Sequence, residues 1–170
     1  PAPWRRPCAC ATLTNVSHSV SETLNSSVKP LDNRSRNVLQ TYKATCHCGE
    51  VAIEADLDLE QASYRCNCSI CRRNRFWPAV ATEGHFRILS GEHDLTKYVF
   101  GGMKNHHFFC RHCGVRVFGV GNDTPIGTMY GVNIGCLEGV SEEQRSNIPV
   151  TYVDGMHDRW DAVPEFFKHL

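Results

Sequence analysis

The chain has 170 residues, 41% of them hydrophobic, and its 18 basic residues balance its 18 acidic ones. This length and composition suit one domain with a modest core. A formal net charge of zero gives no support for a broad electrostatic attraction, so we expect no nucleic-acid partner. No apolar run approaches the ~20 residues that a membrane span requires, and we expect no membrane partner.

Residues 1–40 differ in composition from the rest, because they are rich in Arg, Ser and Thr and contain only Glu22 and Asp32 as acidic residues. Such a segment cannot bury much apolar surface, so we expect a disordered leader. Its composition also fits an organelle transit peptide. Cys8 and Cys10 lie in this leader, and we do not expect them to bind metal, because nothing nearby fixes their geometry.

Residues 41–170 are predicted to form one all-β domain. The segment 51–57 alternates apolar and polar residues, which is typical of a half-buried strand. Eight further short strands are predicted, at 62–66, 78–82, 86–89, 97–100, 106–110, 115–120, 129–134 and 150–153. Glycines separate them, a pattern that favours a sandwich or a barrel-like fold. The segment 141–146 predicts one helical turn with Ser141 as its cap.

Seven of the ten cysteines fall into three tight clusters. The clusters are Cys46-His-Cys48, Cys66-Asn-Cys68-Ser-Ile-Cys71 and Cys110-Arg-His-Cys113. Thiolates at this spacing converge on one point, as a tetrahedral zinc ion requires. Seven ligands are too many for one zinc ion and one too few for two closed sites. Clustered cysteines without a signal peptide favour metal sites over disulfides, and hence a reducing compartment, most simply the cytoplasm.

The first and third clusters share a feature that the middle one lacks. Gly49 and Gly114 follow their last cysteines, and glycine tolerates the positive φ of a sharp turn. Two matching turns of this kind would each supply two thiolates to one closed, structural zinc site. Its predicted ligands are Cys46, Cys48, Cys110 and Cys113.

The middle cluster, Cys66, Cys68 and Cys71, would leave one position of a zinc ion open, which is the pattern of a catalytic site. A zinc ion with three thiolates should activate an incoming thiol better than water. Arg72 follows at once, and it either grips substrate carboxylates or lies on a solvated face. The alternative is a second structural zinc whose fourth ligand is distant, for example Cys136 or a histidine.

Two neighbouring histidines, His106 and His107, lie on one predicted strand, so one of them faces each side. A histidine on a strand is more often a packing or hydrogen-bonding residue than a base, and this is the role that we predict for both.

The order of these motifs resembles one protein family. The segments Cys46-His-Cys48-Gly49, Cys66-Asn-Cys68-Ser-Ile-Cys71-Arg72 and Phe109-Cys110-Arg-His-Cys113-Gly114 are similar to those of the glutathione-dependent formaldehyde-activating enzymes, or S-(hydroxymethyl)glutathione synthases. Centromere protein V belongs to the same broader family. The segment 160–166, Trp-Asp-Ala-Val-Pro-Glu-Phe, is also similar to the family.

The resemblance implies a β-tent fold of short antiparallel strands, a structural zinc on the outer cysteine pairs and a second zinc on the middle triplet. It implies a carbon–sulfur lyase that condenses formaldehyde with glutathione, or acts on a related thiol or carbonyl compound. The alternative is a non-catalytic zinc module that binds a protein partner. Localisation would be cytoplasmic, or mitochondrial if the leader is a transit peptide.

Overall fold

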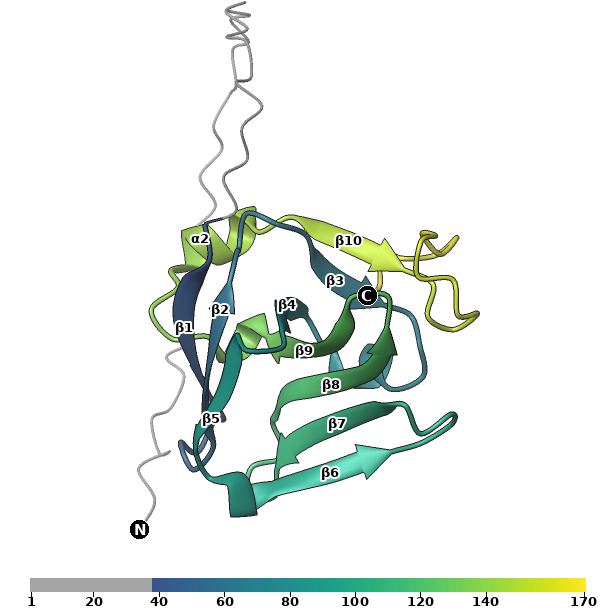
Figure 1. Ribbon diagram of the computed structural model, residues 1–170. Helices are drawn as coiled ribbons and strands as arrows, with labels where there is room; N and C mark the ends of the chain where they lie inside the picture. Colours follow the sequence, from purple (N-terminus) through teal and green to yellow (C-terminus); the bar gives the residue numbers. More distant parts are fainter. Residues whose placement is uncertain (1–37) are drawn as a thin grey trace, which may run out of the picture. The chain divides into compact units, whose positions relative to one another are not determined.

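The computed structural model describes residues 38–170, all of them within one compact unit, Arg36–Leu170 (Figure 1). The predicted leader, with Cys8 and Cys10, lies outside the described residues apart from positions 38–40. The boundary between leader and domain stays a prediction. Within the described residues, no helix is long and apolar enough to cross a membrane.

The predicted all-β fold is confirmed. The strands are β1 (Gln40–Thr45), β2 (Ala52–Leu57), β3 (Ser63–Cys66), β4 (Pro78–Thr82), β5 (Phe86–Ser90), β6 (Leu95–Val99), β7 (Asn105–Cys110), β8 (Arg116–Thr124), β9 (Gly127–Asn133) and β10 (Val150–Val153). The helical elements are α1 (Cys71–Asn74), α2 (Glu142–Asn147) and two 3-10 turns, Glu92–Asp94 and Ile134–Cys136.

Three sheets organise these strands (Figure 1). One sheet has the order β1-β2-β5, and a larger one has the order β4-β9-β8-β7-β6; both are antiparallel. The third pairs β10 with β3, and this pair is parallel, in contrast to the antiparallel strands that were expected. Its register places Val153 beside Cys66, so the end of β10 lies next to the middle cysteine cluster.

The core lies between the two larger sheets. Along β2, Ile53, Ala55 and Leu57 are buried while the acidic residues between them are only partly so, as the alternation predicted. Val117 and Phe118 of β8 pack into the same cluster. Burying apolar side chains of this size contributes roughly 1.5–3 kcal/mol each.

Helix α2 begins where the sequence predicted. The Ser141 side chain accepts a hydrogen bond from the Gln144 backbone N–H at 3.1 Å, and the Gln144 side chain accepts one from the Ser141 N–H at 2.8 Å. This capping box satisfies two backbone donors that a helix start leaves unpaired. The single turn α1 was not predicted; it begins at the last cysteine of the middle cluster.

Candidate metal centre

The first candidate metal site brings together the outer cysteine pairs. The sulfurs of Cys46, Cys48, Cys110 and Cys113 all lie within 4.8 Å of one another. The Sγ atoms of Cys48 and Cys110 are 3.6 Å apart although 62 positions separate these residues. Four converging sulfurs match the donor set of a closed tetrahedral zinc site.

Two similar glycine turns build this group. Gly49 has φ 84° and Gly114 has φ 73°, in the left-handed region that glycine reaches without strain. The N–H of Gly49 donates to the Cys46 carbonyl at 3.1 Å, and that of Gly114 donates to the Cys110 carbonyl at 2.8 Å. Because one turn joins β1 to β2 and the other joins β7 to β8, a metal held here would tie the two larger sheets together.

The second group is the middle triplet. The sulfurs of Cys66, Cys68 and Cys71 lie within 4.8 Å of one another, and no fourth His, Cys, Asp or Glu of the described residues joins them. Hydrogen bonds with Cys68 and then Cys71 raise the pKa of Cys66, while hydrogen bonds with Cys66 and Cys71 lower the pKa of Cys68. The negative charge therefore concentrates on one sulfur, because crowded thiols resist ionising together. A divalent cation removes that conflict, so this donor set fits a metal.

Cys136 was considered as a distant fourth ligand of the triplet, and the structure does not place it there. It is buried, and burial followed by the charges of Cys46 and Cys113 raises its pKa to about 11. These neighbours place Cys136 beside the four-cysteine group, where it packs as a small apolar side chain.

A buried carboxylate fixes the loop of the triplet. Asp154 is 1% exposed, and its Oδ1 accepts a 2.6 Å hydrogen bond from Asn67 Nδ2. Asn67 is the residue between the first two cysteines of the triplet. Hydrogen bonds from Asn67, then Arg159 and His157, lower the pKa of Asp154. Gly155 follows, and a Cβ at this position would lie 2.5 Å from the Cys66 sulfur. The segment after β10 therefore sets the position of the first sulfur.

A buried arginine lies against the last sulfur of the triplet. Arg116 of β8 is 8% exposed, its Nη1 is 3.8 Å from the Cys71 sulfur, and its guanidinium lies 3.5 Å from the centroid of the Phe76 ring. Two paired glycines make room for this stack: Gly119 beneath the guanidinium and Gly131 beneath Phe76. Burial lowers the pKa of Arg116, and the Cys71 thiolate beside it opposes that shift.

His107 lies beside Arg116. It pairs with Gly119 across the β7–β8 ladder, and residues directly opposite each other project to the same face of a sheet. A Cβ on Gly119 would lie 2.6 Å from Arg116 Nη2, so the guanidinium occupies the space next to His107. Burial first, and then the Arg116 charge, lower the pKa of His107 to about 4. Neither ring nitrogen, nor Arg116 Nε, has a hydrogen-bond partner among the described residues.

Three more arginines border the triplet. A hollow of about 10 Å³ is lined by Arg65, Cys66, Cys71, Arg72, Arg75, Phe76 and Leu170. Burial first, and then the neighbouring Arg75, lower the pKa of Arg65, which lies over the Trp77 ring at 4.9 Å. Among the described residues, Arg65, Arg72 and Arg75 have no carboxylate partner within 4 Å. Unbalanced positive charge thus surrounds the triplet.

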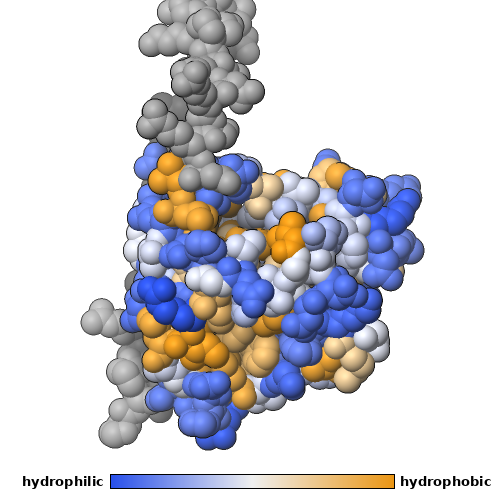
Figure 2. Space-filling model, viewed as in Figure 1, coloured by the Kyte–Doolittle hydropathy of each residue, from blue (hydrophilic) through white to orange (hydrophobic). Residues whose placement is uncertain are grey.

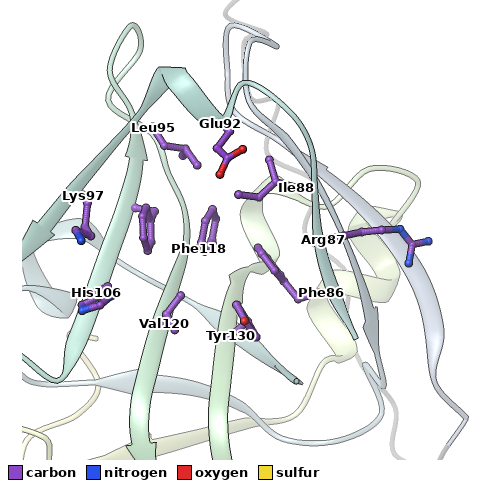
Figure 3. A pocket seen from close by; sticks show the side chains of 11 residues that line it. Phe86, Arg87, Ile88, Glu92, Leu95, Lys97, His106, Phe118, Val120 and Tyr130 are labelled. Atoms are coloured by element: carbon purple, nitrogen blue, oxygen red, sulfur yellow. The ribbon is translucent and has the colours of Figure 1, made fainter. Parts of the chain in front are cut away.

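A larger hollow, of about 570 Å³, lies elsewhere, between β5 and the five-stranded sheet. Its wall includes the stacked rings of Phe86 and Tyr130, with centroids 4.3 Å apart (Figure 3). Figure 2 shows apolar side chains gathered on this face of the molecule. His106 lines the hollow, while the next residue, His107, faces the other side of the sheet. The sheet therefore separates this hollow from the triplet.

Two sulfur clusters on a small all-β scaffold define a candidate metalloprotein with one closed and one incomplete site. Residues 41–153 match the sequence model of the glutathione-dependent formaldehyde-activating enzyme family, and the chain belongs to this family. The fold is also similar to the crystal structure of a Rhodobacter sphaeroides protein, with 38% sequence identity and a TM-score of 0.56 over 64% of this chain and 99% of that one.

Two groups around the triplet were not predicted from the sequence: Arg116 and Asp154. One signal was visible, because Arg116 is a charged residue inside the apolar run Val115-Arg-Val-Phe118. Arginine is almost never fully buried without a partner, so its position on a buried strand points to a function.

Proposed function

We propose that this protein is a zinc-dependent carbon–sulfur lyase that joins formaldehyde, or a related aldehyde, to glutathione or a related thiol. The contrast between the two sulfur groups carries this proposal. Four sulfurs saturate one site, whereas three sulfurs leave the other able to accept a guest. Family membership supports the choice of thiol and aldehyde.

The donor sets support zinc in both places, because soft thiolates in a tetrahedral arrangement suit this ion. Cys46, Cys48, Cys110 and Cys113 would hold a structural zinc that ties the sheets together. Cys66, Cys68 and Cys71 would hold a second one, which when bound would lower the pKa of a thiol in its open position. Thiolate ligands require reduced cysteines, so we assign the protein to a reducing compartment, the cytoplasm or alternatively the mitochondrion.

The charge around the triplet favours an anionic thiol. A divalent ion with three thiolates carries one net negative charge, while Arg65, Arg72, Arg75 and Arg116 border it and have no carboxylate partner among the described residues. A thiol that also carries carboxylates would balance the surplus, and guanidinium groups bind carboxylates in a bidentate manner. We assign Arg72 to substrate carboxylate binding, because it is exposed and lines the hollow beside Cys66 and Cys71.

Binding of a tripeptide requires the end of the described chain to move. The hollow beside the sulfurs is no larger than a water molecule, and Leu170 forms part of its wall. The Arg75 guanidinium also donates a hydrogen bond to the His169 carbonyl. A substrate carboxylate would therefore replace this backbone carbonyl as the partner of Arg75.

A comparison of two thiols tests the proposal. Zinc-loaded protein should accelerate the addition of glutathione to formaldehyde. Because this reaction also proceeds without a catalyst, its rate is measured by exchange NMR with and without the protein. The Arg72→Gln variant should show a raised KM for glutathione and an unchanged KM for 2-mercaptoethanol, which lacks carboxylates. Two zinc sites that ignore every thiol would instead favour the alternative function, a non-catalytic zinc module for a protein partner.

A further inference from the structure

We propose that His107 and Arg116 are catalytic residues of the triplet site, His107 for proton transfer and Arg116 for stabilising the oxyanion. His107 takes the proton of the incoming thiol and returns it to the aldehyde oxygen, and Arg116 donates a hydrogen bond to that oxygen as it gains charge. This inference rests on the proposed function and adds two catalytic residues that neither the cysteine motifs nor the family assignment provides.

The first observation is that three buried nitrogen atoms lack partners. Both ring nitrogens of His107, which is 6% exposed, and Nε of Arg116 make no hydrogen bond among the described residues. Leaving a buried polar group unsatisfied costs roughly 1–3 kcal/mol, so buried groups are nearly always paired. Three such atoms on two adjacent side chains indicate that a polar guest completes them.

The second observation is where these atoms lie. Nη1 of Arg116 lies 3.8 Å from the Cys71 sulfur, and the guanidinium extends over Gly119. His107 is the residue opposite Gly119 on the neighbouring strand, so its side chain lies on the same face of the sheet as the guanidinium. The thiolate charge of Cys68 raises the pKa of His107, whereas the charge of Arg116 lowers it. A guest held at the triplet therefore has a guanidinium and an imidazole on one side. The Phe100 ring stacks on the imidazole with centroids 5.4 Å apart and helps to keep it from solvent.

The chemistry balances without any other reactant. The neutral imidazole accepts the proton of the thiol, and the sulfur attacks the carbonyl carbon to form the C–S bond. The π electron pair of the carbonyl moves to its oxygen, where Arg116 stabilises the negative charge as an oxyanion hole does. The imidazolium then returns the proton to that oxygen, which gives the hydroxyl group and restores neutral His107.

The environment of His107 suits the second half of this cycle, in which the imidazolium returns the proton. Burial and the Arg116 charge keep the ring neutral at physiological pH, so one nitrogen has a lone pair ready to accept a proton. The same features make the imidazolium a strong proton donor once it forms.

The His107→Phe variant tests this role, because phenylalanine keeps an aromatic ring against Phe100 and removes both nitrogens. The matched control is His106→Phe, one position away on the same strand but facing the opposite side of the sheet. We expect His107→Phe to lower kcat about 100-fold or more, with the KM for glutathione changed by less than about threefold. The control should retain wild-type kcat, and both variants should keep the full metal content and melting temperature.

A second variant moves Arg116 without removing it. Gly119→Ala places a methyl group 2.6 Å from Arg116 Nη2 and 3.2 Å from the His106 carbonyl oxygen. The flexible guanidinium can move away, and the backbone needs to shift by only a few tenths of an ångström, so the sheet should stay folded. We expect kcat to fall while the metal content stays unchanged. Wild-type kcat in both His107→Phe and Gly119→Ala would overturn the proposal.

A binding measurement separates this proposal from the proposed function. Glutathione added to zinc-loaded protein should shift the ring ¹⁵N resonances of His107 and leave those of His93, an exposed residue, unchanged. In cobalt-substituted protein, glutathione should perturb the visible spectrum. A cobalt response with no shift at His107 would overturn the role of His107 alone. Silence in both experiments would overturn the proposed function, and this inference with it.

Discussion

Replacing Cys110 with serine should destabilise the domain far more than replacing Cys68 with serine. The metal group that contains Cys110 joins residues 62 positions apart, across two sheets. The group that contains Cys68 joins only residues between positions 66 and 71, so its metal closes a short local loop. A cross-link stabilises a fold partly by restricting the unfolded chain, and longer loops gain more.

The size of the difference follows from these two separations. Loop-closure entropy grows as (3/2)RT ln n, and the ratio of the two separations makes the long loop worth about 2 kcal/mol more. For a domain of this size, that corresponds to a melting temperature about 5–10 °C lower for Cys110→Ser than for Cys68→Ser. The total stability of a domain is ~5–15 kcal/mol, so the longer cross-link is a large part of it.

Thermal unfolding of zinc-loaded, reductant-protected proteins measures this difference. Cys136→Ser serves as the control, because Cys136 is a buried cysteine outside both groups. It separates the loss of a ligand from the loss of a buried sulfur. Equal losses of melting temperature in Cys110→Ser and Cys68→Ser would refute the division into a closed structural site and a local open one.

Three further changes test other parts of the structure. Gly91→Ala should destabilise by more than about 2 kcal/mol in urea unfolding, since its Cβ would overlap a backbone carbonyl at φ 74°. Gly84→Ala, also at positive φ but with no atom of the described residues within 4 Å of its Cβ, should lose only about 1 kcal/mol, and equal losses would contradict the packing described. Gly155→Ala should displace the Cys66 sulfur and reduce bound zinc from two ions to one by elemental analysis; full zinc content would count against that contact. Hydrogen bonds lower the folded-state pKa of Asp154, so its stabilisation is complete above the unfolded pKa of ~3.9 and is lost as pH falls through the folded value. The melting temperature of Asp154→Asn should therefore lie furthest below wild type near pH 7 and approach it below about pH 4, whereas a gap independent of pH would contradict the assignment.

Local signals predicted much of the fold. The bounds of β4 and β10 agree with the predicted strands 78–82 and 150–153, because short apolar runs next to turn residues identify strands locally. The two glycine turns could also be predicted, because a sharp turn with positive φ after a cysteine pair favours glycine. The shared geometry of these turns is what allowed the cysteines to be sorted into two groups before the sheets were known.

The surroundings of the triplet could not be predicted in the same way, because they depend on pairing between distant segments. The parallel register of β10 and β3 brings Asp154 to Asn67, residues 87 positions apart. A register shift between β7 and β8 sets Arg116 opposite Phe109 and leaves its side chain to lie across Gly119. Histidines on strands are usually packing residues, and only the pairing of His107 with Gly119 shows that this one lies on the same face of the sheet as the Arg116 guanidinium.

Metal analysis with cobalt substitution tests the central claim most directly. We predict two metal ions per chain, each with the visible spectrum of a tetrahedral cobalt thiolate site, of which glutathione perturbs one. Cys68→Ser should abolish the glutathione response and keep the spectrum of the four-cysteine site. A single metal ion per chain, or two that both ignore glutathione, would contradict an account in which three sulfurs leave one metal open to a thiol.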